Sequence, residues 1–281
     1  MKASFLMCPP RHFGVSYVIN PWMQGNAGQV DTALAARQWD ALYAAMRQIA
    51  NVHLVEPVPG LPDMVFTSNA AVVLDGRVIP AQFHHAEREG EETHFESWFR
   101  AEGFEVVGLP GGIAFEGAGD ALYDQTRGCL WVAYGRRTRA ATSVLLHEAL
   151  SVETVPLRLV DPYYFHLDTC FCPLDDGWLL WYPPAFDAAA RSEIELRVPA
   201  ARRIVVGDED ARDFACNAIC LAGNLLVNRA SPQLQRALRS AGYRVIELPL
   251  GEFVKAGGAA RCLTLRLDES RAGSPAFARA A

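Results

Sequence analysis

Four short segments concentrate reactive and polar side chains in surroundings that are otherwise apolar or rich in turns. They are residues 62–69 (PDMVFTSN), 115–120 (FEGAGD), 166–170 (HLDTC) and 257–264 (GGAARCLT). Together they supply a thiol, an imidazole, several carboxylates and glycine-rich turns that let the backbone approach a ligand. Thiol-dependent nucleophilic catalysis uses this set of groups.

Cys262 is the candidate nucleophile. It follows the glycine pair Gly257 and Gly258 and precedes an alternating strand-like run over Leu263–Leu267, so its thiol could project into a cavity. A nucleophilic thiolate needs a lowered pKa, a nearby base or a cationic ligand. A buried structural cysteine is the commoner alternative, and the local sequence leaves both readings open.

His166 and Asp168 are candidates for acid–base work and for binding a cation. They lie two residues apart, so on an extended strand both side chains point to the same side. An imidazole can transfer a proton near neutral pH. The alternative is a surface histidine beside a turn aspartate. Glu116, which precedes Gly117, is likewise either a turn residue or a carboxylate that points inward.

The sequence gives little support for a metal or a cofactor. Three closely spaced groups could suggest zinc: His84 with His85, Cys170 with Cys172, and Cys216 with Cys220. Their spacings do not match paired zinc-binding cysteines, and adjacent residues on a strand point in opposite directions. No glycine-rich phosphate loop follows the first strand. We therefore expect neither a metal nor a cofactor.

Composition excludes several classes of function. The chain has 281 residues, of which 51% are hydrophobic and 21% charged, and its net charge is −6. An acidic chain is poorly suited to binding nucleic acid, because phosphates must be neutralised by a basic surface. The apolar runs fall far short of the roughly 20 residues that span a bilayer. We expect a small-molecule substrate, with neither nucleic acid nor membrane as partner; a homo-oligomer is left open.

The cysteines indicate a reducing compartment. Seven of them are scattered along the chain, and an odd number cannot pair completely. Residues 1–10 do not show a charged segment followed by an apolar one, the pattern of a secretion signal. A cytoplasmic location is the simplest expectation.

The elements that must position these residues form a regular series. A helix capped by Asp31 is predicted to run to Ile49, and Asp75-Gly76 predicts a hairpin. Further helices are expected over 89–101, 138–151, 187–198 and 232–241, with strands at 53–55, 70–74, 78–81, 104–109, 121–123, 129–132, 153–159, 178–182, 203–206, 218–221, 224–227 and 243–247. Two strands, a helix and a strand recur four or five times without a linker, which predicts one α/β domain over residues 1–281 with a radial or solenoid arrangement.

The four segments, taken in order, resemble the guanidino-group-modifying superfamily of arginine deiminases, dimethylarginine dimethylaminohydrolases, amidinotransferases and arginine dihydrolases. The likeness extends through residues 7–267, and its strongest elements are FEGAGD, HLDT and GGAARC. MCPPRHFGVSYVINPWM (residues 7–23) and PDMVFTSNA are most similar to the arginine dihydrolase (guanidine hydrolase) domain of cyanobacterial arginine-catabolising enzymes. The family fold implied is a five-bladed α/β propeller with pseudo-fivefold symmetry, the pentein fold.

The resemblance also implies a role for each residue of the site. Cys262 would be the nucleophile, His166 the general acid and base, and Glu116 and Asp168 carboxylates that bind a guanidinium. The expected substrate contacts are Asn20, Asn69, Arg88 and Arg137, the two arginines at the α-carboxylate, with Asp63 and Phe66 near the pocket. These roles imply hydrolysis of L-arginine through a covalent cysteine-thiouronium intermediate to ornithine, carbon dioxide and two ammonia molecules.

Position 69 bears on the product. Deiminases and dimethylarginine hydrolases typically carry aspartate at the matching position, whereas this chain has Asn69, whose amide can donate to a ureido oxygen. We hypothesise that Asn69 permits a second hydrolysis. The alternatives are a dimethylarginine dimethylaminohydrolase or an arginine deiminase that releases citrulline, an amidinotransferase, and a non-catalytic protein that binds guanidino compounds.

Overall fold

Five three-stranded sheets make up the computed structural model, which describes residues 2–271. In each sheet the middle strand is antiparallel to one neighbour and parallel to the other. The parallel pair is always joined through a helix, which is the connection that parallel strands require. The predicted unit of two strands, a helix and a strand is therefore confirmed, and it occurs five times.

The sheets have the orders β15-β1-β2, β3-β4-β5, β6-β7-β8, β9-β10-β11 and β12-β13-β14. Their strands are β1 (Ser4–Met7), β2 (Asn51–Leu54), β3 (Ala71–Leu74), β4 (Arg77–Pro80), β5 (Glu105–Val106), β6 (Ala121–Asp124), β7 (Cys129–Tyr134), β8 (Glu153–Arg158), β9 (Phe171–Pro173), β10 (Leu179–Trp181), β11 (Arg203–Val205), β12 (Ile219–Leu221), β13 (Asn224–Val227), β14 (Arg244–Glu247) and β15 (Leu265–Arg266). The crossover helices are α1 (Thr32–Ile49), α2 (Ala86–Ala101), α4 (Thr142–Leu150), α5 (Ala188–Arg197) and α7 (Pro232–Ser240).

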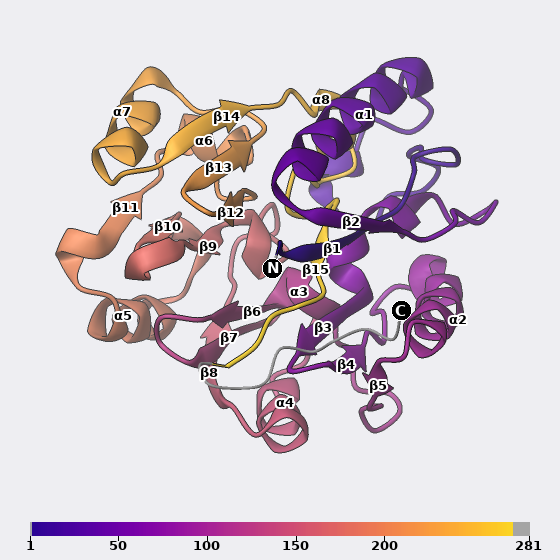
Figure 1. The fold of residues 1–281 in the computed structure, drawn as a ribbon, viewed down its shortest axis with the longest axis horizontal. Coiled ribbons are helices and arrows are strands. Elements are labelled where there is room, and N and C mark those ends of the chain that lie inside the picture. The colour runs from indigo at the N-terminus through magenta and orange to yellow at the C-terminus, as the bar shows by residue number, and fades with distance from the viewer. Residues whose placement is uncertain (1, 272–281) are drawn as a thin grey trace.

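The crossover helices lie at the periphery of the molecule and the sheets lie inside them (Figure 1). Three shorter helices, α3 (Gly117–Asp120), α6 (Asp208–Arg212) and α8 (Gly251–Val254), belong to the connections. The first sheet differs from the others in its origin, because β15 from the far end of the chain pairs with β1. The two ends of the described chain thus share one sheet.

Local sequence explains the best-predicted elements. The Asp31 carboxylate accepts a hydrogen bond from the Leu34 amide at 2.9 Å, which caps α1, and the apolar face of the helix packs inward through Trp39, Leu42 and Met46. Between β3 and β4, Asp75 and Gly76 both have positive φ (52° and 78°), as a two-residue hairpin of this kind requires.

Three of the differences between the predicted and the observed elements lie at or next to site residues. The helix expected over 138–151 begins only at Thr142, because the preceding residues turn Arg137 and Thr138 inward. His166 and Asp168 do not share a strand. His166 precedes the 3-10 helix η4 (Leu167–Thr169), so its side chain and that of Asp168 serve different partners. The strand expected over 263–267 is reduced to Leu265–Arg266.

Apolar burial is distributed among several clusters of side chains between the sheets and their helices. Trp131, Trp181, Phe171 and Phe186 pack together in the largest cluster. Within residues 2–271, helices long and apolar enough to cross a membrane are absent.

Candidate active site

A small pocket brings together segments from the whole length of the chain. It is lined by Ile19, Asn20, Met23, Asp63, Phe66, Asn69, Arg88, Arg137, Phe165, His166, Ala256, Gly257 and Cys262. Eight of the ten predicted site residues are in this lining, and the other two, Glu116 and Asp168, lie directly behind it, bonded to His166 and Cys262. The remaining space is about 20 Å³, which is room for about one water molecule.

The Cys262 thiol lies between a carboxylate and an amide. Its Sγ is 3.3 Å from Asp168 Oδ2, to which it donates, and it accepts a hydrogen bond from Asn217 Nδ2 at 3.1 Å. Burial, reinforced by the neighbouring Asp168 carboxylate, raises the pKa of the Cys262 thiol well above its ordinary value. Without a ligand, the cysteine is therefore held as a neutral thiol.

Asn217 fixes the cysteine loop as well as its sulfur. Its Oδ1 accepts from the amides of Ala259 (3.0 Å) and Cys262 (3.1 Å), while its Nδ2 donates to the Asp168 carbonyl at 3.0 Å. The side chain is fully buried and all of its polar capacity is used. Asn217 therefore couples the cysteine segment to the Asp168 segment.

His166 and Arg137 share one carboxylate. His166 Nε2 lies 2.7 Å from Glu116 Oε2, and Arg137 donates to the same oxygen at 3.0 Å. Burial opposes ionisation of Glu116, but Arg137 and His166 outweigh it and hold its pKa well below the ordinary range. Glu116 is thus a permanent anion that orients the imidazole. Its carboxylate is engaged within the protein, and direct binding of a guanidinium by Glu116 stays a prediction.

Arg88 holds Asn69 in one orientation. Its guanidinium forms a two-point ion pair with Glu91 (2.9 and 2.8 Å) and donates to Asn69 Oδ1 at 2.8 Å. Because the Asn69 oxygen is occupied, its Nδ2 faces the other way, 3.4 Å from Ser68 Oγ. Both arginines predicted to meet a carboxylate are therefore already paired inside the protein, although both line the pocket.

Two carboxylates keep an oxygen unused. Asp63 Oδ2 accepts from the Tyr17 hydroxyl at 2.9 Å, and Asp168 Oδ2 accepts from Ser68 and Cys262, both at 3.3 Å. The second oxygens, Asp63 Oδ1 and Asp168 Oδ1, are buried and have no hydrogen-bond partner in the described part of the chain. Burial raises the pKa of both carboxyl groups. A cationic N–H donor at either place would give the buried oxygen the hydrogen bond that it lacks.

Asn20 covers the pocket without leaving its amide free. Asn20 Oδ1 caps the 3-10 helix η1 (Pro21–Met23) by accepting from the amides of Trp22 and Met23, and its Nδ2 donates to the Ala256 carbonyl at 3.0 Å. The expected substrate contact is therefore occupied in this state. With only 20 Å³ of space below it, a ligand of several carbon atoms can enter only if these covering segments move.

Two glycines permit the close packing of the site. A Cβ at Gly119 would lie 2.3 Å from Asn69 Nδ2, and one at Gly258 would lie 2.5 Å from the Phe66 ring. Real Cβ atoms do not approach other atoms so closely, so these positions require glycine.

Tyr17, Ser68 and Asn217 are site residues that the sequence did not single out. Tyr17 lies in the segment 7–23 and Ser68 in the segment 62–69, both of which carry the resemblance to the superfamily, so their position in these motifs could have identified them. Asn217 lies in none of them, and its contacts with Cys262 span 45 residues, so only the fold reveals it. Among residues 2–271, His, Cys, Asp and Glu do not gather in a group of three that could hold a metal ion.

Comparisons with known proteins find relatives that match most of the chain. A family model described as N,N dimethylarginine dimethylhydrolase, eukaryotic, matches residues 17–268. The chain is 36% identical over 264 residues to the N(G),N(G)-dimethylarginine dimethylaminohydrolase of Mycobacterium tuberculosis, with 94% of this chain and 85% of that protein covered.

Similarity is higher to the bifunctional arginine dihydrolase/ornithine cyclodeaminase ArgZ of Synechocystis sp., at 49% identity over 94% of this chain. The chain spans only 37% of the length of that relative. A crystal structure of the N-terminal domain of ArgZ, a cysteine-to-serine variant bound to its substrate, has a TM-score of 0.95 and 48% identity, and covers 95% of this chain and 99% of that one. Another structure of that domain, an asparagine-to-serine variant, is covalently bound to a reaction intermediate.

Proposed function

The chain belongs to the N,N-dimethylarginine dimethylhydrolase family, and we propose that within this family it is an arginine dihydrolase. It would convert L-arginine and two water molecules into ornithine, carbon dioxide and two ammonia molecules. The higher similarity to a bifunctional arginine dihydrolase supports this choice over a dimethylarginine hydrolase. No cofactor enters the proposed reaction.

One observation carries the proposal: a thiol lies against a buried carboxylate whose second oxygen is unused. Asp168 touches Cys262 through Oδ2, and its Oδ1 has no partner within residues 2–271. A guanidinium can donate two parallel N–H bonds to one carboxylate. Asp63 Oδ1 is a second vacant acceptor and suits the α-ammonium of the same ligand. The site therefore favours a substrate with a cation at each end.

Substrate binding would switch on the nucleophile. The Cys262 proton is held by burial and by Asp168. A guanidinium bound to Asp168 cancels the effect of that negative charge, and its own positive charge beside the sulfur offsets the effect of burial. The Asn217 amide then stabilises the thiolate by donating to it. The cysteine stays unreactive until its substrate arrives.

His166 would carry the protons. His166 takes the proton of the Cys262 thiol as the sulfur attacks the guanidino carbon and a C–S bond forms; the tetrahedral adduct collapses when His166 passes that proton to the departing ammonia. His166 then takes a proton from water, which attacks the thiouronium carbon and breaks the C–S bond to release a ureido compound. The Glu116 carboxylate, fixed by Arg137, holds the imidazole for both steps.

The second cycle would depend on Asn69. A ureido group presents a carbonyl oxygen where the guanidinium presented N–H donors, so the site needs a donor there. Arg88 occupies Asn69 Oδ1, and the amide nitrogen, which donates one N–H to Ser68 Oγ at 3.4 Å, keeps a second N–H to donate. Renewed attack expels the second ammonia, and hydrolysis of the resulting carbamoyl-cysteine gives a carbamate that decays to carbon dioxide and ornithine.

The architecture forms part of the same proposal. We expect the five sheets to close into a pseudo-fivefold propeller, a single catalytic domain over residues 1–281, with the active site at its centre. The pairing of β15 with β1 and the convergence of segments 19–23 and 256–262 on one pocket support closure. The seven unpaired cysteines support a reducing, cytoplasmic location.

Product analysis tests the function. Incubation with L-arginine, followed by mass spectrometry and an ammonia assay, should give ornithine and about two ammonia molecules per arginine. Citrulline with one ammonia would instead make the protein a deiminase, and dimethylamine released from dimethylarginine would make it a dimethylarginine hydrolase. Transfer of the amidino group from arginine to added glycine or lysine would indicate an amidinotransferase. Cys262→Ser should abolish turnover while arginine still binds; binding without turnover by the unaltered protein would leave only a binding role.

A further inference from the structure

A second, larger cavity lies behind the catalytic cysteine. It has a volume of about 770 Å³, within the range of small-molecule sites. The segments 68–69 and 261–262 separate it from the catalytic pocket: Ser68 and Arg261 line the large cavity, whereas Asn69 and Cys262 line the pocket. Each of these two segments thus contributes one residue to each cavity.

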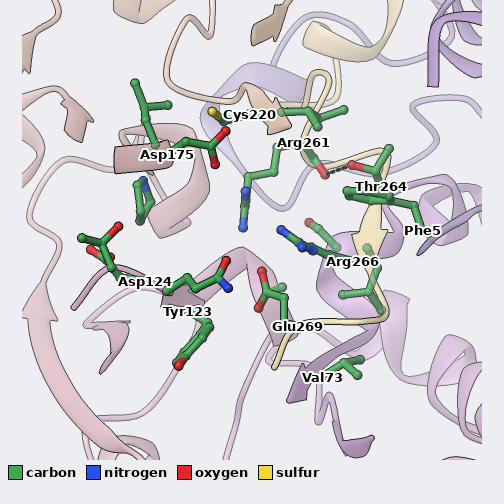
Figure 2. A pocket seen from close by; sticks show the side chains of 18 of the residues that line it. Phe5, Val73, Tyr123, Asp124, Asp175, Cys220, Arg261, Thr264, Arg266 and Glu269 are labelled. Carbon is green, nitrogen blue, oxygen red and sulfur yellow. Dashed lines mark hydrogen bonds between the residues drawn. The ribbon is translucent and has the colours of Figure 1, made fainter. Parts of the chain in front are cut away.

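Two guanidinium groups point into this cavity side by side. Figure 2 shows the ends of Arg261 and Arg266 directed toward the middle of the cavity, with the Glu269 carboxylate facing them. Arg261 Nε is buried and has no hydrogen-bond partner in residues 2–271. Arg266 uses its Nε on Asp268 (3.0 Å), which leaves the outer nitrogens of the guanidinium toward the cavity. The two guanidinium groups thus offer N–H donors to the cavity, and a carboxylate can accept hydrogen bonds from both of them.

The opposite charge is present in the same cavity. Glu269 and Asp175 are both in its lining, on different walls (Figure 2). Burial raises the pKa of the Glu269 carboxyl even though Arg266 and Arg261 oppose the rise. A simple anion would be attracted by the arginines but repelled by these acids. A molecule with both charges satisfies both sets of groups.

We propose that this cavity binds a small zwitterion of the α-amino acid class, with the ligand carboxylate on Arg261 and Arg266 and its ammonium group on Glu269 or Asp175. The site is separate from the catalytic pocket, and binding there does not depend on the proposed function. Its consequence for arginine turnover does rest on that function.

The wall between the cavities links the ligand to the nucleophile. Ser68 Oγ donates to Asp168 Oδ2 at 3.3 Å, and the Ser68 amide donates to the Cys262 carbonyl at 3.1 Å. Arg261 acts on Asp168 through its charge and lowers the pKa of that carboxyl. A ligand carboxylate on Arg261 would cancel this effect, so Asp168 would hold the guanidinium less well. An amino acid in the cavity should therefore inhibit, chiefly by raising KM.

Calorimetric titration with L-ornithine tests the binding. The unaltered protein should bind at two sites per chain, the catalytic pocket and the cavity, whereas Arg266→Gln and Glu269→Gln should each retain one. Arg244→Gln is the matched control, because Arg244 is an exposed arginine of β14 outside the cavity lining, and it should keep both sites. Thermal unfolding of each variant establishes that it is folded.

Ornithine binding that persists undiminished in both cavity variants, whether at one site or at two, would overturn the proposal, whereas a single site that both variants abolish would still be the cavity. Competition by acetate as effective as that by L-alanine would also overturn it, because the cavity would then be an anion site. In turnover assays, L-alanine should raise the KM for arginine several-fold in the unaltered protein and leave it unchanged in Arg266→Gln. If arginine is not turned over but both ornithine sites are present, the proposed function fails and this inference stands.

Discussion

Replacing Asn217 by aspartate should separate the nucleophile from the group that stabilises its charge. Asn217→Asp keeps the shape of the side chain and the oxygen that accepts from the amides of Ala259 and Cys262. It replaces the Nδ2 donor, 3.1 Å from the Cys262 sulfur, with an oxygen. The variant thus loses the hydrogen bond to the sulfur and the one to the Asp168 carbonyl and, when ionised, places a second anion beside the thiolate.

The magnitude follows from the contact with the sulfur. A hydrogen bond to a charged group contributes about 1.5–3 kcal/mol, so its loss should reduce the thiolate population at a fixed pH by about 10- to 150-fold. Repulsion by the new carboxylate adds to this loss. Because Asp168 already opposes ionisation of Cys262, the remaining thiolate would depend almost entirely on bound substrate.

The assay is the rate of Cys262 alkylation by iodoacetamide as a function of pH, followed by peptide mass spectrometry. The rate for Asn217→Asp should fall by at least tenfold, and its rise with pH should move to higher pH. Asn228→Asp is the control, because Asn228 likewise donates to a carbonyl (Asp213, 2.8 Å) and accepts from an amide (Leu250, 2.8 Å) away from the cysteine. A folded Asn217→Asp protein alkylated as fast as the unaltered one at every pH would refute the reasoning.

Four further predictions address other parts of the site. Asn69→Asp should shift the product from ornithine to citrulline, seen by mass spectrometry; unchanged ornithine yield would show that Asn69 does not set the product. Glu116→Gln should lower kcat by about 10²- to 10⁴-fold in steady-state assays and, because it leaves Arg137 buried without a counter-charge, cost about 3–5 kcal/mol in urea unfolding; near-normal kcat would exclude an orienting role. Burial raises the pKa of Asp120 from 3.8 to about 6, so the folded state binds a proton there more tightly than the unfolded state does. About 3 kcal/mol of the free energy of unfolding that is present below pH 4 should therefore be lost as the pH rises through 6. Urea unfolding between pH 4 and 7 should show this fall, and Asp120→Asn should remove it. Gly119→Ala should lower activity far more than the midpoint of thermal unfolding, because the added Cβ displaces Asn69 and His166; equal activity would mean that the site can adjust.

The repeated unit was predictable because its signals are local. The Asp31 cap, the Asp75-Gly76 turn and the alternation of short strands with amphipathic helices each depend on a few consecutive residues. These signals predict four or five repeats, and the number is five because β15 completes the first sheet from the far end of the chain. The resemblance to the superfamily is confirmed by the matched family model and by the relatives.

The sequence predicted which ten residues converge, but it missed Tyr17, Ser68 and Asn217 and did not show how the residues are arranged. All ten predicted residues meet at the pocket or directly behind it. Their partners were not predictable, because each is set by contacts between segments distant in sequence. Arg137 lies 21 residues from Glu116, and His166 lies 50 residues from it. The alternation of side chains on a strand predicted that His166 and Asp168 point to the same side. In the structure the 3-10 helix η4 separates them, so His166 contacts Glu116 and Asp168 contacts Cys262.

The pairing of β15 with β1 has a consequence for how the protein is made. During synthesis, Ser4–Met7 and Asn51–Leu54 emerge early, but their sheet is complete only when Leu265–Arg266 arrive more than 200 residues later. Cys262 lies three residues before that last strand, so the candidate nucleophile emerges after the carboxylates of Asp63 and Asp168. A ribosome that stops early would release a chain that carries those carboxylates but lacks the thiol. Pairing over so long a distance in sequence also slows folding, because the chain must close a large loop before the contact forms.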